Sequence, residues 1–320
     1  SGEDLELKLA EIRRDPRVES AQAMNVFETQ GTQYDDPYAA MQPAIEVLSI
    51  EAAHQRATGR GVTVAVIDSR VDARHPEIRG RVEKRLDLVN GSRSSRAAEV
   101  HGTAVAGVIA STANNAEGIV GVAPDVKLAS LRACWTVDSV SGRAQCSSFS
   151  LAQALETAIA FEVDIVNMSL SGPSDPLLER LIDEALQQGI IVVAAVPDTP
   201  DAGDFPASHS GVIAGAGSSN QAVMAGQRDV LRAPGTEVLS TTPNGRYAFF
   251  SGNSMSAAYV AGVAALLVEH RPGITAAEVR RVLAETSSGD SINACRAVAR
   301  LVNGSNCDDV SGLLAAGNEG

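Results

Sequence analysis

The sequence predicts an α/β fold with a doubly wound, mostly parallel sheet flanked by helices. Short runs of Val, Ile and Ala, such as Val62–Ile67, recur along the chain. Continuous apolar runs of this length are typical of strands that are buried on both faces. Helical patterns alternate with these runs, as they do in βαβ units. The 320 residues are 44% hydrophobic and 20% charged, which is enough apolar material for one large core or two unequal domains.

The first elements in chain order form a small separate unit. An amphipathic helix is predicted at residues 5–15, an extended segment at 17–29 and a polar joint at 30–36. Buried strands are then expected at residues 62–67, 127–132, 163–170, 190–196 and 212–217. Helical periodicity predicts intervening helices at residues 102–111, 149–161 and 175–188. Because ligands of open α/β sheets bind beyond the carboxyl ends of the strands, we expect the functional site there.

The last third of the chain is predicted to end the fold with a hairpin and three helices. The segment 237–250 contains Pro243-Asn244-Gly245 and predicts a hairpin. It leads into an apolar helix that begins near residue 252. Helices at residues 274–286 and 292–302 are expected to complete the core.

Charge and missing motifs exclude several function classes. The net charge of -13 argues against nucleic-acid binding, which needs a basic patch for the phosphates. No uninterrupted apolar run of about 18 residues predicts a membrane span, and no basic-then-apolar segment opens the chain as a signal peptide does. A nucleotide-dependent enzyme is the least favoured class, because the chain lacks a P-loop and a strand-linked GxGxxG motif.

The four cysteines form two local pairs with the same short spacing, Cys134 with Cys146 and Cys295 with Cys307. We favour two disulfides; thiols in the core are the alternative, and metal ligation is least favoured because neither pair has CxxC spacing. Structural disulfides belong to oxidising compartments. The cysteines therefore predict a secreted or periplasmic protein.

Three polar residues occupy positions suited to nucleophilic catalysis. Asp68 ends the predicted strand 62–67, His101 opens a helix of small residues, and Ser254 lies where a loop becomes an apolar helix. Unpaired N–H groups in a first helical turn favour negative charge beside such a serine. In a triad the serine attacks a carbonyl, the histidine takes and returns its proton, and the aspartate orients the histidine.

Three sequence blocks resemble the subtilisin-like serine proteases over about residues 36–290. They are Asp68-Ser69-Arg70-Val71-Asp72, His101-Gly102-Thr103-Ala104-Val105-Ala106-Gly107 and Gly252-Asn253-Ser254-Met255, in that family's order. Alone, each of the three central residues is most simply a cap or turn residue. Together they identify a triad, and the resemblance implies a serine endopeptidase that hydrolyses peptide bonds through an acyl-enzyme. Peptides or proteins are the expected substrates.

The resemblance also implies a substrate strand and a propeptide. The segment 167–172 is similar to the strand that pairs with an extended substrate, so Ser169, Leu170 and Ser171 are expected to line it. Residues 5–29 resemble the last part of an inhibitory propeptide. The expected organisation is therefore a propeptide remnant at 1–30, a peptidase domain at 31–306 and a C-terminal tail at 307–320. Cleavage near 30–36 would release a mature enzyme from this zymogen, which makes the chain's own propeptide segment a partner and self-processing an expected activity.

The oxyanion hole departs from the family pattern. The family usually has an asparagine after the strand that corresponds to residues 190–196, whereas Ala194-Ala195-Val196-Pro197 leads here to Asp198. We therefore expect an oxyanion site formed by Asp198 and Ser254, with low activity. A catalytically silent peptide-binding module is the alternative.

Three smaller features also depart from the pattern. Arg70 stands where the family commonly has glycine, and Ala258 where it commonly has proline. The tail 315–320 resembles the missing oxyanion block at the wrong end of the chain, which we attribute to chance rather than to donation by Asn318.

A structural calcium site is a further expectation. Asp36 lies roughly where the family has an early calcium-binding aspartate, and Glu77 and Asn115 lie in neighbouring loops. Oxygen ligands from separate loops suit calcium. The alternative is turn and capping chemistry, for which Asp and Asn are also well suited. The triad chemistry itself needs no cofactor.

Overall fold

The protein is described by a computed structural model, which describes residues 2–24, 34–89, 99–138, 144–199, 203–218, 230–302 and 307. The chain divides into two compact units, Ser1–Thr32 and Gln33–Gly320. The first unit contains the helix α1 (Gly2–Ile12), which covers most of the predicted segment 5–15. After it, the Arg13 Nε group donates to the Ala21 carbonyl at 2.7 Å. The predicted extended segment 17–29 is described only as far as residue 24.

The second unit is built on a seven-stranded sheet in which every pair of neighbouring strands is parallel. This confirms the predicted α/β fold. In spatial order the strands are β2 (Val82–Asp87), β3 (Lys127–Arg132), β1 (Thr63–Asp68), β6 (Ile165–Met168), β7 (Ile191–Ala195), β8 (Ile213–Gly217) and β9 (Leu231–Ala233). The two edge strands were not predicted, because β2 is largely exposed and charged and β9 has only three residues.

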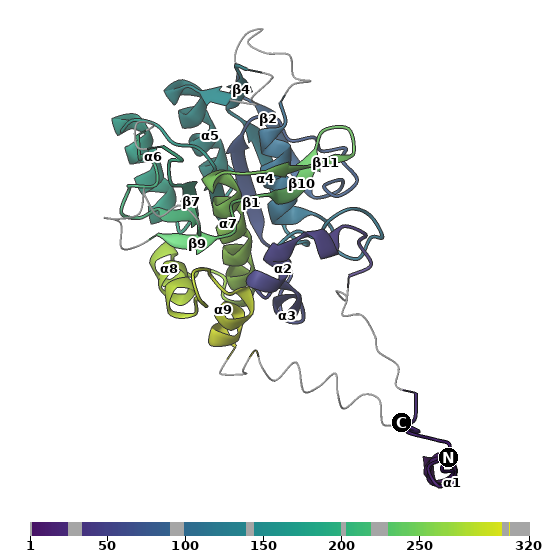
Figure 1. Cartoon of the computed structure of the whole chain (residues 1–320). Coiled ribbons are helices and arrows are strands. Elements are labelled where there is room, and N and C mark those ends of the chain that lie inside the picture. Colours follow the sequence, from purple (N-terminus) through teal and green to yellow (C-terminus); the bar gives the residue numbers. More distant parts are fainter. Residues whose placement is uncertain are drawn as a thin grey trace. The chain divides into compact units, whose positions relative to one another are not determined.

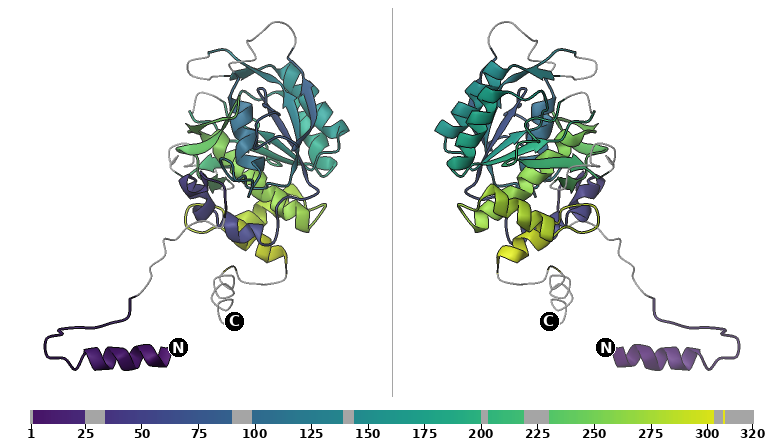
Figure 2. Two further views of the ribbon diagram at one scale, coloured as in Figure 1. Left: turned by 90° about the vertical axis from the view of Figure 1, so that its right-hand side faces the viewer. Right: turned by 90° about the vertical axis from the view of Figure 1, so that its left-hand side faces the viewer.

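Helices cover both faces of the sheet (Figures 1 and 2). One face packs against α4 (His101–Ala110) and α7 (Asn253–His270), and the other against α5 (Ser148–Ala160) and α6 (Pro176–Gln187). Small residues allow close packing on the first face. A Cβ atom added to Gly215 of β8 would lie 2.8 Å from the Cα atom of Ala257 in α7. The glycine therefore fixes how closely the helix of the predicted serine approaches the sheet.

The remaining elements surround this core. The predicted hairpin consists of β10 (Val238–Thr242) and β11 (Arg246–Phe250), and it leads directly into α7. A second hairpin, β4 (Cys134–Thr136) with β5 (Ala144–Cys146), was not predicted because its strands have three residues each. The other described helices are η1 (Ala39–Met41), α2 (Pro43–Val47), α3 (Ile50–His54), α8 (Ala276–Glu285) and α9 (Ala294–Leu301).

Both cysteine pairs form disulfides. Cys134 and Cys146 lie directly opposite each other in the β4–β5 hairpin and close it. The second disulfide joins Cys295, at the start of α9, to Cys307. Residues 308–320, including Asn318, lie outside the described residues.

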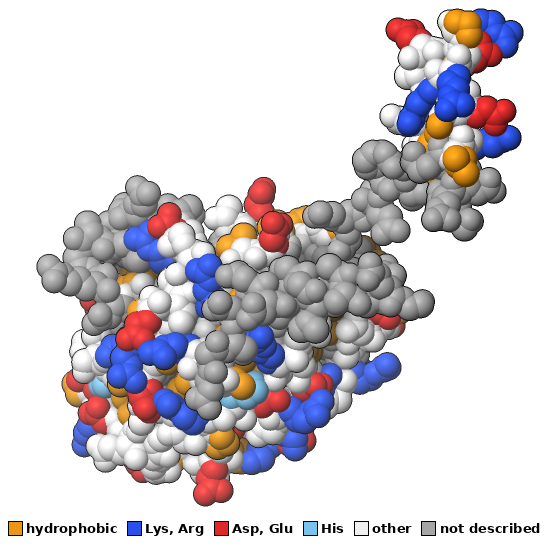
Figure 3. Space-filling view, turned by 90° about the horizontal axis from the view of Figure 1, so that it is seen from below, with side chains coloured by type: hydrophobic (Ala, Val, Ile, Leu, Met, Phe, Trp, Pro, Cys, Tyr) orange, Lys and Arg blue, Asp and Glu red, His pale blue; other side chains and the backbone are white. Residues whose placement is uncertain are grey.

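The face seen from below is polar and mixed in charge. On the face seen in Figure 3, acidic and basic side chains alternate, and hydrophobic side chains surface only in small groups. No helix among the described residues is both long enough and apolar enough to cross a bilayer.

Candidate active site

Asp68 is the last residue of β1 and lies at the carboxyl edge of the sheet. Its side chain is only 3% exposed. Both carboxylate oxygens lie 2.9 Å from the Nδ1 atom of His101, and one also accepts the Ser69 backbone N–H at 2.6 Å. A buried carboxylate in this position holds the imidazole in one orientation and leaves its Nε2 atom available on the opposite side of the ring.

His101 is the first residue of α4, and its backbone is fixed against the loop that follows β1. The Gly102 N–H donates to the Ser69 hydroxyl at 3.0 Å, and any side chain on Gly102 would overlap the Ser69 carbonyl oxygen. Burial lowers the pKa of His101, but the Asp68 carboxylate, with a smaller contribution from the charge of Asp198, raises it above its ordinary value overall. The Asp68 carboxylate therefore favours the protonated form of the His101 imidazole.

Ser254 is the second residue of α7, where the backbone N–H groups of the first turn have no intrahelical acceptors. The helix start is fixed by Asn253, which is 3% exposed. Its Oδ1 atom accepts the Gly217 N–H at 2.8 Å, and its Nδ2 atom donates to the Val196 carbonyl at 3.0 Å. Asn253 thus connects the start of α7 to the ends of β7 and β8.

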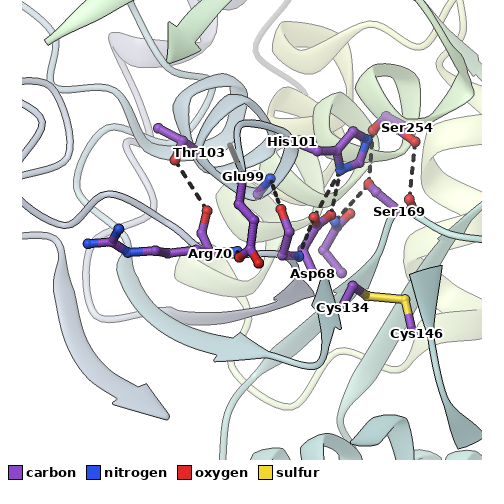
Figure 4. A network of polar contacts seen from close by, with 12 residues as sticks. Asp68, Arg70, Glu99, His101, Thr103, Cys134, Cys146, Ser169 and Ser254 are labelled. Carbon is purple, nitrogen blue, oxygen red and sulfur yellow. Dashed lines mark hydrogen bonds and ion pairs between the residues drawn. A yellow bond between two sulfur atoms is a disulfide. The ribbon is translucent and has the colours of Figure 1, made fainter. Parts of the chain in front are cut away.

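The hydroxyl of Ser254 is held by Ser169 (Figure 4). The Ser254 Oγ atom donates to the Ser169 carbonyl at 3.1 Å, and the Ser169 Oγ atom donates to the Ser254 carbonyl at 3.0 Å. The described hydrogen bond of the nucleophile is therefore to Ser169 and not to His101. Hydrogen bonds between catalytic groups often tighten only when substrate binds.

The predicted substrate-lining residues follow β6 directly. Ser169 is buried at 5% exposure and packs against the serine helix, whereas Leu170 and Ser171 are half-buried. The next residue, Gly172, forms an isolated antiparallel bridge with Phe205. The segment therefore continues past β6 with contacts to Ser254 on one residue and to Phe205 on another.

Asp198 follows β7 and lies beside the start of α7. Its Oδ1 atom accepts the Asn253 N–H at 2.9 Å. The carboxylate thus caps the positive end of α7, one residue before Ser254. The structure brings all four predicted residues, Asp68, His101, Asp198 and Ser254, to one edge of the sheet.

Comparisons with known proteins agree with this arrangement. The model of the Subtilase family (Peptidase_S8) matches residues 59–312. The chain belongs to this family. Subtilisin E of Bacillus subtilis (strain 168) is 34% identical over 296 residues, which cover 88% of this subtilase and 74% of the relative. This subtilase therefore belongs to a family of serine proteases.

Two solved structures have the same fold as this subtilase. A protease of Pseudoalteromonas arctica PAMC 21717 aligns with a TM-score of 0.64 and 25% identity, covering 85% of this subtilase and 100% of that chain. Fervidolysin of Fervidobacterium pennivorans, a keratinolytic enzyme related to subtilisin, aligns with a TM-score of 0.70 and 21% identity. That alignment covers 85% of this subtilase and 48% of fervidolysin.

The two replaced family residues have different surroundings in this subtilase. Ala258 is fully buried inside α7, where alanine keeps the backbone N–H that a proline lacks. The backbone of Arg70 is held on both sides, because its N–H donates to Glu99 at 3.0 Å and its carbonyl accepts from the Thr103 hydroxyl at 3.3 Å. Arg70 is therefore anchored between β1 and α4, and its side chain extends away from His101 (Figure 4).

Sequence reasoning missed a buried ion-pair network behind His101. Glu99 is fully buried and accepts from the Arg132 guanidinium, with the Nε atom at 2.7 Å. Arg132 also donates to Asp87 at 2.7 Å. The hydrogen bonds to Glu99 and Asp87 outweigh burial and raise the pKa of Arg132. No local pattern links these residues, because they come from β2, β3 and the segment before α4.

The predicted metal ligands Asp36, Glu77 and Asn115 also meet in space. Asp36 accepts the backbone N–H groups of Asn114 at 2.8 Å and of Asn115 at 3.3 Å. The Asn115 Nδ2 atom donates to Glu77 at 3.2 Å. Tyr247 of β11, which the sequence did not indicate, donates its hydroxyl to Glu77 at 2.9 Å. This cluster connects the segments around residues 36, 77 and 115 to the hairpin before α7.

The electrostatics of this cluster suit a cation. Burial, with a smaller contribution from the nearby Asp36 carboxylate, outweighs the hydrogen bonds to Glu77 and raises its pKa to about 7. Burial also raises the pKa of Asp36. A divalent ion would offset the repulsion between the two carboxylates and be coordinated by their oxygen atoms, which are hard ligands. Among the described residues, no three His, Cys, Asp or Glu side chains are grouped so that they could hold a metal ion, so a site here would also need amide or main-chain oxygens.

Proposed function

We propose that this subtilase is a serine endopeptidase in which Ser254 is the nucleophile, His101 the general base and acid, and Asp68 the residue that orients His101. The observation that carries the proposal is the Asp68–His101 pair at 2.9 Å, at the same sheet edge as a serine in the first turn of a buried helix. This is the geometry in which acyl transfer needs no metal or organic cofactor.

The reaction follows from these positions. If the Ser254 hydroxyl turns from the Ser169 carbonyl to His101, the Nε2 atom can take its proton while the oxygen attacks the peptide carbonyl. The imidazolium, stabilised by Asp68, then gives the proton to the leaving amine. Water repeats the sequence on the acyl-enzyme and releases the acid product. The Ser254 N–H at the helix start is the donor for the tetrahedral oxyanion.

Asp198 makes this oxyanion site a weak one. An ionised carboxylate beside the developing oxyanion repels it, and the repulsion is strong in a partly desolvated site. A protonated Asp198 has an O–H group that can donate to the oxyanion instead. We therefore propose low turnover at neutral pH.

The substrate is a peptide bound in extended form along residues 169–171. Backbone pairing with such a segment recognises any sequence and leaves selectivity to side-chain pockets. We propose that residues 1–30 are the remnant of an inhibitory propeptide and residues 31–306 the peptidase domain. The separate compact unit at Ser1–Thr32 supports this division. Cleavage between the two would then be a self-processing step of the zymogen.

Two further properties are proposed from the same structure. The disulfides favour an oxidising compartment, so we place the protein outside the cell or in the periplasm. We propose that the carboxylates of Asp36 and Glu77, with the amide oxygen of Asn115, hold a structural calcium ion. Bound calcium would connect the segment before α2 to the loops after β1 and α4.

A catalytically silent peptide-binding module is the second candidate. It is favoured by the Asp198 carboxylate at the oxyanion position and by the Ser254–Ser169 hydrogen bond. Digestion of an unfolded protein by the chain and by its Ser254→Ala variant separates the two candidates. The proposal predicts cleavage that falls by about 10⁶-fold in the variant, a loss of the size measured in the relative subtilisin. Equal cleavage, or none by either protein, would reject the endopeptidase.

A further inference from the structure

A basic cleft lies beside the Asp68–His101 pair. Its volume is about 350 Å³, and it is lined by Arg70, Arg85, Leu86, Asp87, Ser130 and Arg132. This concentration of arginines is unusual for a chain with a net charge of -13. Three arginines and one aspartate line the cleft, so its lining is positively charged although the chain as a whole is acidic.

The sheet register places this cleft next to the active site. Arg132 is the register partner of Asp68 on one side and of Asp87 on the other. Arg85 is the register partner of Ser130. Since register partners in a parallel sheet point to the same face, these cleft residues share the face on which α4 presents His101. Helix α4 packs on β1 and β3, while β2 remains largely exposed at the edge.

Two of the three arginines are available to a ligand. Arg132 is already matched by Glu99 and Asp87. Within the described part of the chain, the guanidinium groups of Arg70 and Arg85 have neither a hydrogen-bond partner nor an ion-pair partner. Asp87, which also lines the cleft, is bonded to Arg132, and the oxygens of the nearby Asp72 accept the backbone N–H groups of Arg74 and Asn244.

The backbone of Arg70 is held in place beside the cleft. Its backbone is fixed by Glu99 and Thr103, and the buried Glu99 is itself fixed by Arg132. Figure 4 shows the Arg70 side chain leaving the site on the side opposite Ser254. A rigid backbone reduces the entropy that an arginine loses when it binds a carboxylate in a bidentate manner.

We infer that this cleft binds an acidic side chain of the peptide substrate, so that Arg70 and Arg85 act as specificity-determining residues. The inference rests on the proposed peptidase function and names its substrate class. Neighbouring strands lie about 4.8 Å apart, so β2 is about 10 Å from β1. An extended peptide rises about 3.3 Å per residue. The preferred Asp or Glu therefore lies about three residues from the scissile bond, on one side of it.

The binding test uses the full chain carrying Ser254→Ala and two fluorescent peptides of identical sequence, one with several Asp residues and one with Asn in their place. Fluorescence anisotropy should show about tenfold tighter binding of the Asp peptide. Arg70→Gln or Arg85→Gln should each reduce that preference about threefold, and the double variant should abolish it. Added salt should weaken the preference, because surface charges are screened.

Arg180→Gln is the matched control, since Arg180 is an exposed arginine of α6 on the other face of the sheet. It changes the net charge equally and should leave the preference intact. Equal binding of the two peptides, binding of neither, or an equal effect of Arg180→Gln would overturn the inference.

A digest separates this inference from the proposed function. The unmutated chain should cut an unfolded protein at bonds with Asp or Glu enriched at one position about three residues away, and the double variant should cut without that enrichment. Cleavage without enrichment rejects the acidic cleft but keeps the peptidase. Preferential binding of the Asp peptide without any cleavage rejects the peptidase but keeps the cleft as a peptide-binding site.

Discussion

At the scale of single residues, Asp198 has two effects that act in opposite directions. Its carboxylate caps the Asn253 N–H at 2.9 Å and so stabilises the start of α7. Its negative charge lies beside the first turn of α7, where we propose that the oxyanion forms, and contributes to the raised pKa of His101. In the proposed mechanism Asp198 therefore supports the helix that carries Ser254 while it opposes the negative charge that forms when Ser254 attacks.

Asp198→Asn is expected to raise turnover by about 10² fold, because a donor replaces a repelling charge; the reverse loss is known from subtilisin, a relative of this chain. Asparagine caps a helix as well as aspartate does, so folding should be unchanged. The general base must be neutral, and removing the charge of Asp198 lowers the pKa of His101. The acidic limb of kcat/KM should therefore move to lower pH.

A pH profile of kcat/KM for the two proteins tests both effects. Asp290→Asn is the control, because Asp290 is exposed. Unchanged or lower turnover in a folded Asp198→Asn protein would refute this view of the oxyanion site.

Much of the candidate site was predictable at this scale. Asp68, His101 and Ser254 each lie in a short contiguous block that can be recognised in the sequence alone. The role of Asn253 as a connection between α7 and two strand ends, and the pairing of Glu99 with Arg132, depend on contacts between distant segments. Such contacts leave no local pattern, so only the structure shows them.

At the scale of elements, the start of α4 is fixed by close backbone packing. Gly102 lies against the Ser69 carbonyl, and its N–H binds the Ser69 hydroxyl. The sequence predicted a close-packed helix from the small residues of 102–111, but it did not show that the close contact involves the loop that carries the triad aspartate.

Gly102→Ala should destabilise the protein by about 1–3 kcal/mol, because the added methyl group overlaps backbone atoms that cannot rotate away. The displaced helix should also misplace His101 and lower activity. Gly172→Ala is the matched control, since a Cβ there meets nothing within 4 Å. Urea unfolding monitored by circular dichroism measures the difference, and equal stability of the two variants would contradict this account of the α4 position.

The sequence predicted the central strands because burial on both faces gives them continuous apolar runs. It missed β2 because an exposed edge strand carries charged side chains on its surface. It also missed the β4–β5 hairpin, although both cysteines of its disulfide had been paired correctly by spacing. Sequence periodicity reflects burial, and β2, β4 and β5 are short or largely exposed strands with few buried residues.

At the scale of the whole molecule, the cluster of Asp36, Glu77, Asn115 and Tyr247 connects segments that are far apart in the chain. Asp36 precedes the first helices of the second unit, and Tyr247 lies in the hairpin that leads into α7. An ion bound here would stabilise the folded state only, because the unfolded chain separates its ligands.

Calcium is therefore expected to raise the melting temperature by about 5 °C relative to EGTA at a concentration well above its Kd. Glu77→Gln should remove most of the increase, while Glu46→Gln, at an exposed position of α2, should keep it. Differential scanning calorimetry makes the comparison. Identical melting temperatures in calcium and EGTA would show that the cluster is held by hydrogen bonds alone.

The central claim is that three distant side chains form one working proton-transfer system, and covalent labelling of Ser254 tests it most directly. A fluorophosphonate should label the folded chain at Ser254, as located by mass spectrometry of the digested protein. His101→Ala should slow labelling by about 10² to 10⁴ fold, the usual contribution of a positioned general base. Labelling of folded protein at Ser254 that is no faster with His101 than without it would contradict the account.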